Sequence, residues 1–215
     1  MAHLIETMAY ANAVPWHGLG NNINADSPIE DWQRQSGLDW TVSKRPVLFR
    51  GKDDFSGIGS NHFKDKFVLA RDTDNRPFSV VSGRYKPVQP SEVLEFFRDL
   101  IATHGMTIET AGSLKDGKRI WALAKTGDAH KVLGNDLVNS YLLIATSYDL
   151  TFSTLAQFTS VRVVCNNTLQ QSLDDYISRV TIPHFRDFNA TDVHEQLGLG
   201  RAQWGAFSQA LDAIA

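Results

Sequence analysis

Apolar and polar residues alternate in many segments of the chain, and a period of two predicts β-strands. The alternating segments are 41–50, 66–71, 78–82, 107–111, 119–125, 140–147, 151–159 and 160–165. Turn-forming residues separate several of them, such as the Asp116-Gly117 pair, because glycine accepts the positive φ of a tight turn. We therefore expect three hairpins with residues 160–165 extending the sheet, and the hairpins span 66–82, 107–125 and 140–159.

Apolar residues at spacings of three and four predict the helices. The segment 90–104 begins with a proline and an acid and ends at a glycine, which predicts one continuous helix. A second helix is expected over 167–178, with Asn166 or Asn167 as its cap. Two shorter helices are expected near 27–32 and 191–194.

The order of these elements predicts the fold class. Hairpins that are each followed by a helix indicate an α+β fold with an antiparallel sheet. The first forty residues are rich in proline, glycine and asparagine and are expected to be mostly loop. The predicted organisation is an N-terminal arm over 1–40, a core domain over 41–182 and a C-terminal helical segment over 183–215.

An apolar stripe marks the last predicted helix. Its residues recur at three- and four-residue steps and are Trp204, Phe207, Leu211 and Ile214. An exposed stripe of this kind would form an unusual apolar patch. We expect a homo-oligomer in which this helix forms the subunit contact, and burial in the chain's own core is the alternative.

The composition is that of an ordinary globular protein. The chain has 215 residues, 42% of them hydrophobic and 21% charged, so disorder over most of its length is not expected. No apolar run approaches the roughly 18 residues that a membrane helix needs, and we expect no membrane partner. The one cysteine, Cys165, excludes an internal disulfide and suits a reducing cytoplasm.

The charge is distributed unevenly along the chain. Residues 41–86 hold ten Lys and Arg against five Asp, a net charge of +5, which leaves −8 for the remainder of a chain whose total is −3. A basic segment on an acidic body suits a protein that lays one face on a polyanion. A solvated face with compensating charges is the alternative. The residues expected on phosphates are Lys44, Arg45, Lys64, Lys66, Arg71, Arg84 and Lys86.

Aromatic residues accompany these cations. Tyr85 lies between Arg84 and Lys86, where it could stack on an unpaired base or belong to the core. Trp16 and Trp40 lie in or beside loop-like chain, where they could anchor the N-terminal arm or stack on bases. The sequence leaves both alternatives open.

Patterns typical of enzymes and metal sites are not found. The seven histidines are scattered, there is no Cys-x-x-Cys, and no glycine-rich phosphate loop is present. We therefore expect no metal, no cofactor and no catalytic residue. Cys165 follows an apolar run and is interpreted as a buried small hydrophobe, with a nucleophile as the alternative. The helix start at Asn166 and Asn167 is either a cap alone or a cap with an anion site.

Four short motifs connect the chain to a family. They are Pro-Trp-His-Gly-Leu-Gly at 15–20, Leu-Asp-Trp-Thr-Val at 38–42, Gly-Arg-Tyr-Lys-Pro-Val-Gln at 83–89 and Arg-Val-Val-Cys-Asn-Asn-Thr-Leu at 162–169. In order and spacing they resemble the phage and plasmid proteins that share domain of unknown function 932. The resemblance covers roughly residues 1–180. It indicates the family of the chain but no activity.

The basic hairpin that leads into an amphipathic helix is similar in outline to the core of phage single-strand annealing proteins, a family that forms oligomers on single-stranded DNA. This likeness is architectural. We expect a non-catalytic phage or plasmid protein that binds single-stranded DNA as a homo-oligomer in the cytoplasm of a bacterial host, of the annealing type used in DNA recombination. The alternative is an anti-defence or interaction factor that binds a host protein.

Overall fold

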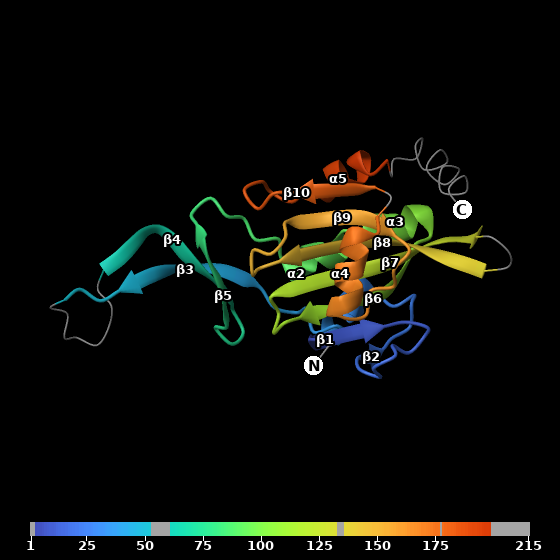
Figure 1. Ribbon diagram of the computed structural model, residues 1–215, viewed down its shortest axis with the longest axis horizontal. Coiled ribbons are helices and arrows are strands. Elements are labelled where there is room, and N and C mark those ends of the chain that lie inside the picture. The colour runs from blue at the N-terminus through green and yellow to red at the C-terminus, as the bar shows by residue number, and fades with distance from the viewer. Residues whose placement is uncertain (1–2, 53–60, 133–135, 177, 199–215) are drawn as a thin grey trace.

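The computed structural model describes residues 3–52, 61–132, 136–176 and 178–198, and it is an α+β structure with two sheets (Figure 1). In these residues a seven-stranded main sheet has the order β10-β9-β8-β7-β6-β1-β2, and its strands are antiparallel except for β1 and β2. The strands are β1 Ile5–Tyr10, β2 Asn21–Asn22, β6 Thr107–Leu114, β7 Arg119–Val132, β8 Asp136–Ser147, β9 Thr154–Thr159 and β10 Arg179–Ile182. The expected fold class and the three hairpins are confirmed.

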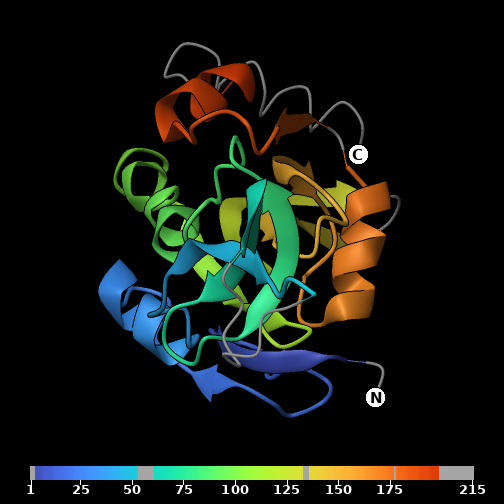
Figure 2. The same ribbon diagram turned by 90° about the vertical axis from the view of Figure 1, so that its left-hand side faces the viewer.

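Helices cover both faces of the main sheet (Figure 2). They are α1 Ile29–Gln35, α2 Pro90–Glu95, α3 Arg98–His104, α4 Asn166–Asp174 and α5 Ala190–Gln196. Successive side chains of a strand point to opposite faces, so Ile120 of β7 packs with α1, α2, α3 and α5, whereas its neighbour Trp121 packs with α4. The sheet is therefore buried on both sides, with two apolar clusters.

The second sheet has the order β3-β4-β5 and projects from one end of the body (Figure 1). Its strands are β3 Val42–Phe49, β4 Asn61–Arg71 and β5 Pro77–Ser82. We call it the projecting sheet. It is formed by a stretch of chain that lies between β1 and β6, two strands that are neighbours in the main sheet.

The N-terminal residues belong to the body. β1 pairs with β6 across the register Met8↔Gly112, and a Cβ on Gly112 would lie 2.4 Å from the carbonyl oxygen of Thr7. The close approach of β1 therefore needs glycine at this position. Residues from all three expected regions, including Trp32, Ile120 and Val193, pack in one core cluster. The boundaries at 40 and 182 consequently do not separate independent cores.

Some expected elements differ from the observed ones. The helix expected over 90–104 is interrupted between α2 and α3, where Phe96 and Phe97 are both fully buried and contact each other edge to face. Consecutive positions of one straight helix point about 100° apart, so a break lets both rings reach the core. Residues 160–165 form no strand, and α4 ends at Asp174 rather than at 178.

The cap of α4 is also one residue earlier than expected. Cys165 is the N-cap, and its sulfur and the Thr168 hydroxyl form a capping box. The apolar stripe Trp204, Phe207, Leu211 and Ile214 lies outside the described residues, so the predicted subunit contact stays a prediction.

Candidate nucleic-acid interface

The projecting sheet is joined firmly to the body through Arg71. Its Nη1 and Nη2 both donate to Oε1 of Glu6 on β1, at 2.9 Å each, and its Nη2 also donates to Asp74 at 2.8 Å. The guanidinium lies 5.3 Å from the centre of the Trp40 ring. Arg71 is only 7% exposed. The prediction that Arg71 contacts phosphates is therefore corrected, because its charge is used inside the protein.

Asp74, in the turn between β4 and β5, is the second acidic partner of Arg71. The hydrogen bond from Arg71 is the main cause that lowers the pKa of Asp74 to about 2. A carboxylate with a lowered pKa stays ionised through the ordinary pH range. The ion pair between Arg71 and Asp74 in the turn between β4 and β5 therefore persists at neutral and mildly acidic pH.

An aromatic cluster lies at the base of the projecting sheet. Phe78 of β5 stacks on Tyr148 with ring centres 5.3 Å apart, and Trp40 lies 5.9 Å from each of these rings. The hydroxyl of Ser79 donates to the carbonyl oxygen of Tyr148 at 2.6 Å. Trp40 is 6% exposed, so it anchors the chain and is not available to bases.

The segment 83–89 continues this anchoring. The Tyr85 ring stacks on His184 at 4.6 Å, and its hydroxyl donates to the carbonyl oxygen of Ser147 at 3.3 Å. Tyr85 is 8% exposed, and burial raises its pKa above the ordinary value. The prediction that Tyr85 stacks on a base is corrected, and the alternative of a core residue holds. Lys86 is exposed but pairs with Asp187 at 2.5 Å.

The remaining cations of the predicted set differ in how they are held. Lys44 donates to the carbonyl oxygen of Gly83 at 2.7 Å, and Arg45 pairs with Asp72 at 2.6 Å. Hydrogen bonds from Ser43 and Thr41 are the main causes that lower the pKa of Asp72. Both cations are exposed and so are only partly committed to the protein.

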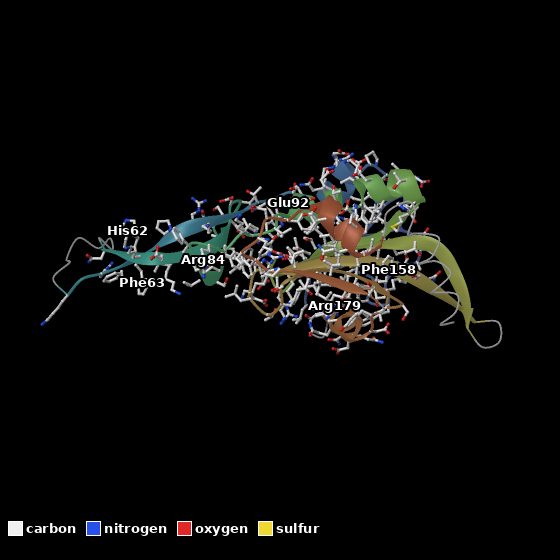
Figure 3. The ribbon with its side chains drawn as sticks, turned by 90° about the horizontal axis from the view of Figure 1, so that it is seen from above. His62, Phe63, Arg84, Glu92, Phe158 and Arg179 are labelled. Atoms are coloured by element: carbon white, nitrogen blue, oxygen red, sulfur yellow. The ribbon has the colours of Figure 1, made fainter. Side chains whose placement is uncertain are left out.

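Three cations have no such commitment. Lys64, Lys66 and Arg84 are exposed, and no other described residue forms a hydrogen bond or ion pair with their side chains. Lys66 pairs in the sheet with Ser82, two residues before Arg84. Arg84 lies at the base of the projecting sheet, while His62 and Phe63 lie near its far end (Figure 3). The free cations therefore occur along the projecting sheet.

Two aromatic residues that the sequence reasoning missed lie on the same sheet. Phe49 and Phe63 are 49% and 53% exposed, and their ring centres are 6.5 Å apart at an interplanar angle of 69°. Large apolar side chains are usually buried more deeply. The available signal was the occurrence of phenylalanines within a basic, strand-forming segment. The projecting sheet thus combines exposed cations with exposed rings.

A further exposed aromatic lies on the body, where two of the sequence motifs meet. His17 accepts from the amide of Leu19 at 3.0 Å through Nδ1, and its Nε2 lies 2.9 Å from the carbonyl oxygen of Val164. Trp16, beside it, is 70% exposed. The anchoring that was one of the two alternatives for Trp16 is therefore carried out by His17.

The motif at 162–169 has a structural role in the same place. Arg162 donates to Glu109 at 2.7 Å and to the carbonyl oxygen of Ala13 at 2.7 Å. Cys165 is 1% exposed, which fits a packed thiol rather than an accessible nucleophile. Asn166 accepts from Arg119 at 3.0 Å.

Searches for other kinds of site gave nothing in the part of the chain that the structure describes. No group of three or more histidine, cysteine or acidic side chains there is arranged to hold a metal ion. Among the same residues no helix has the length and apolar character to cross a membrane.

These observations define an α+β protein with a projecting basic sheet that carries exposed rings. Its sequence matches the family model of Domain of unknown function (DUF932) over residues 77–215, and the chain belongs to this family. The matched range includes the motifs at 83–89 and 162–169, whose contacts are described above. No curated protein and no solved structure matches the chain.

Proposed function

We propose that this protein binds single-stranded DNA through the projecting sheet and does so without catalysis. The observation that carries the proposal is the pair Phe49 and Phe63, half exposed on a sheet that also presents free cations. In this proposal the protein acts as a homo-oligomer of the annealing type in the cytoplasm of a bacterial host.

The charges supply the affinity for the strand. Lys64, Lys66 and Arg84 contact phosphates, and Lys44 and Arg45 contribute by exchanging their present partners for phosphate oxygens. The sequence gives residues 41–86 a charge of +5 on a chain of −3, so a polyanion is attracted to this part of the molecule. Phosphate contacts of this kind are independent of base sequence.

The rings supply the preference for a single strand. The faces of bases are free in unpaired DNA, and a base stacked on an aromatic side chain contributes about 1–3 kcal/mol. Phe49 and Phe63 meet edge to face, so each offers a surface to a base of the same strand. Paired bases in a duplex are stacked on each other and cannot use these rings without unstacking.

One of the two edge strands of the projecting sheet, β3, disfavours a β-strand as the partner. The Gln89 side chain binds both the amide and the carbonyl group of Val42 on β3, at 2.9 and 3.1 Å. Pro46 has no amide hydrogen to offer farther along the strand. Strand addition by another chain at β3 is therefore blocked in two places.

The test is binding of a labelled 30-nucleotide oligothymidine at several salt concentrations. Lys64→Glu/Lys66→Glu should weaken binding by more than tenfold. Each lost phosphate contact also makes the logarithmic salt slope shallower by about 0.7. Arg34→Glu/Arg186→Glu is the matched control, because it reverses the same number of exposed charges on α1 and before α5.

Equal losses in the two double variants would show only a general charge effect and contradict the proposal. A flat salt response of the unmodified protein would do the same. In that case the alternative of a factor that binds a host protein takes its place. Light scattering on the same samples tests the homo-oligomer, and a strict monomer at micromolar concentration contradicts that part.

A further inference from the structure

The turn that carries Trp16 is held rigidly from several sides. The amide of Gly18 donates to the carbonyl oxygen of Pro15 at 2.9 Å, which closes a turn with Trp16 and His17 at its centre. Gly18 has φ +70, a conformation that glycine adopts without strain. His17 then fastens the turn to Val164 through Nε2.

The Trp16 ring also contacts the ring of His17. The Trp16 and His17 rings contact each other edge to face at 5.2 Å, and the His3 ring lies 5.9 Å from His17. The amide of Asn166 donates to the carbonyl oxygen of His3 at 3.0 Å. The start of the chain, the turn and the first residue of α4 thus form one unit under Trp16.

Trp16 is much more exposed than the other described tryptophans. Trp32, Trp40 and Trp121 are between 0% and 6% exposed, whereas Trp16 is 70% exposed. A rigid, open aromatic side chain loses little conformational entropy when a flat ligand stacks on it. Among the described residues the ring is left largely uncovered, so it is open to a ligand.

We propose that Trp16 is a second stacking site, which receives an unpaired base of the same single strand that the projecting sheet binds. This inference rests on the proposed function and adds a contact on the body of the protein. The strand then passes from the projecting sheet to the body, and the two contacts act together only when the strand is long enough to reach both.

The residues beside Trp16 include polar groups that suit the edges of a base. Its exposed neighbours in the chain are Asn12, Ala13, Gly18, Gly20, Asn21 and Asn22, together with the apolar Val14 and Leu19, which are 62% and 41% exposed. A base needs one open ring for its face and polar groups for its edges. Asn167, exposed one residue after Asn166, adds an amide that can pair with a base edge.

The experiment compares oligothymidine with an abasic strand of the same length, which keeps the phosphates and lacks the bases. Trp16→Ala should weaken oligothymidine binding by at least about fivefold, the lower end of the range for base–aromatic stacking. It should leave abasic-strand binding and the salt slope unchanged. Trp16→Phe should restore most of the affinity, and Val14→Ala, a 62% exposed neighbour, is the control without effect.

Strand length provides a second measurement. A series from 5 to about 40 nucleotides should show no effect of Trp16→Ala on the shortest strands that still bind and a full effect on the longest. Fluorescence detects the contact directly. The emission of Trp16, identified as the part that is lost in Trp16→Phe, should be quenched by oligothymidine and not by the abasic strand.

The outcomes separate this inference from the proposed function. If Lys64→Glu/Lys66→Glu weakens binding and Trp16→Ala does not, the projecting sheet binds DNA and the Trp16 site is refuted. An equal loss for abasic and thymidine strands also refutes stacking at Trp16. If the unmodified protein binds no oligonucleotide, both proposals fail, and Trp16 is then a candidate contact for a protein partner.

Discussion

Arg71 and Glu6 join the two sheets of the protein, because both terminal nitrogens of the Arg71 guanidinium donate to one oxygen of the Glu6 carboxylate at 2.9 Å. The side chains are 9% and 19% exposed. The same Glu6 carboxylate accepts from Ser113 of β6 at 3.0 Å. The base of the projecting sheet is thus attached to the first strand of the body and to its neighbour.

Replacing Glu6 should loosen this attachment. Glu6→Gln leaves the buried Arg71 with only Asp74 as a charged partner, and we expect the free energy of unfolding to fall by about 1–3 kcal/mol. Urea denaturation measures the change. Arg76→Ala, which removes a 39% exposed partner of the same carboxylate, should have a smaller effect. A Glu6→Gln protein as stable as the unmodified one would argue against the junction.

Tyr85 provides a test of the corrected assignment. Tyr85→Ala removes a buried ring and should lower the stability by about 3–5 kcal/mol, whereas Tyr85→Phe keeps the stack on His184 and should cost about 0.5–1.5 kcal/mol. Tyr85→Phe should also keep the full affinity for oligothymidine. Loss of binding by a stable Tyr85→Phe protein would return this residue to the interface.

Two histidines should make the C-terminal part of the body sensitive to mild acid. Burial is the main cause that lowers the pKa values of His184 and His194 below the ordinary 6.5. Both are then neutral in the folded protein, and the unfolded chain takes up protons first as the pH falls. Their contribution to stability is complete above about pH 6.5 and decreases below it.

The measurement is the melting temperature between pH 8 and pH 5. His184→Gln/His194→Gln should have a flatter profile below pH 6.5 than the unmodified protein. His62→Gln, on the exposed end of the projecting sheet, is the control and should keep the original profile. Equal slopes in all three proteins would contradict the role of the two buried rings.

Cys165 should behave as a packed thiol. Cys165→Ala removes the side chain that caps α4 and should lower stability by about 0.5–2 kcal/mol, whereas Cys165→Ser keeps a capping acceptor and should be milder. A thiol reagent should react slowly with the native protein and quickly after denaturation. Fast reaction of the native protein at neutral pH would support the alternative that Cys165 is a nucleophile.

Local patterns predicted most of the fold. The hairpins follow from alternation and from turn residues such as Asp116 and Gly117, which act between neighbours in the chain. β1 and β10 were missed because four to six residues carry little periodicity, and pairing with distant strands decides their state. The break at Phe96 and Phe97 was missed because helical spacing does not tell how many rings the core accepts.

The candidate interface was predictable only in outline. The charge of residues 41–86 indicated a basic surface, but not which cations are free. Besides Asp74, Arg71 is bound by Glu6, and Lys86 is bound by Asp187; Glu6 and Asp187 lie 65 and 101 residues away in the chain. Separations of this length are set by the tertiary fold, so no local pattern distinguishes these two cations from Lys64 and Lys66.

The pairing of β1 with β6 has a consequence for how the chain folds. Ile5 pairs with Leu114, so a chain that is being synthesised cannot place its first strand until β6 has left the ribosome. The projecting sheet closes through short loops by comparison and can form earlier, since loop closure is faster for neighbours in the chain. The slow step of refolding should therefore be the pairing of β1 with β6, and the projecting sheet should form before it.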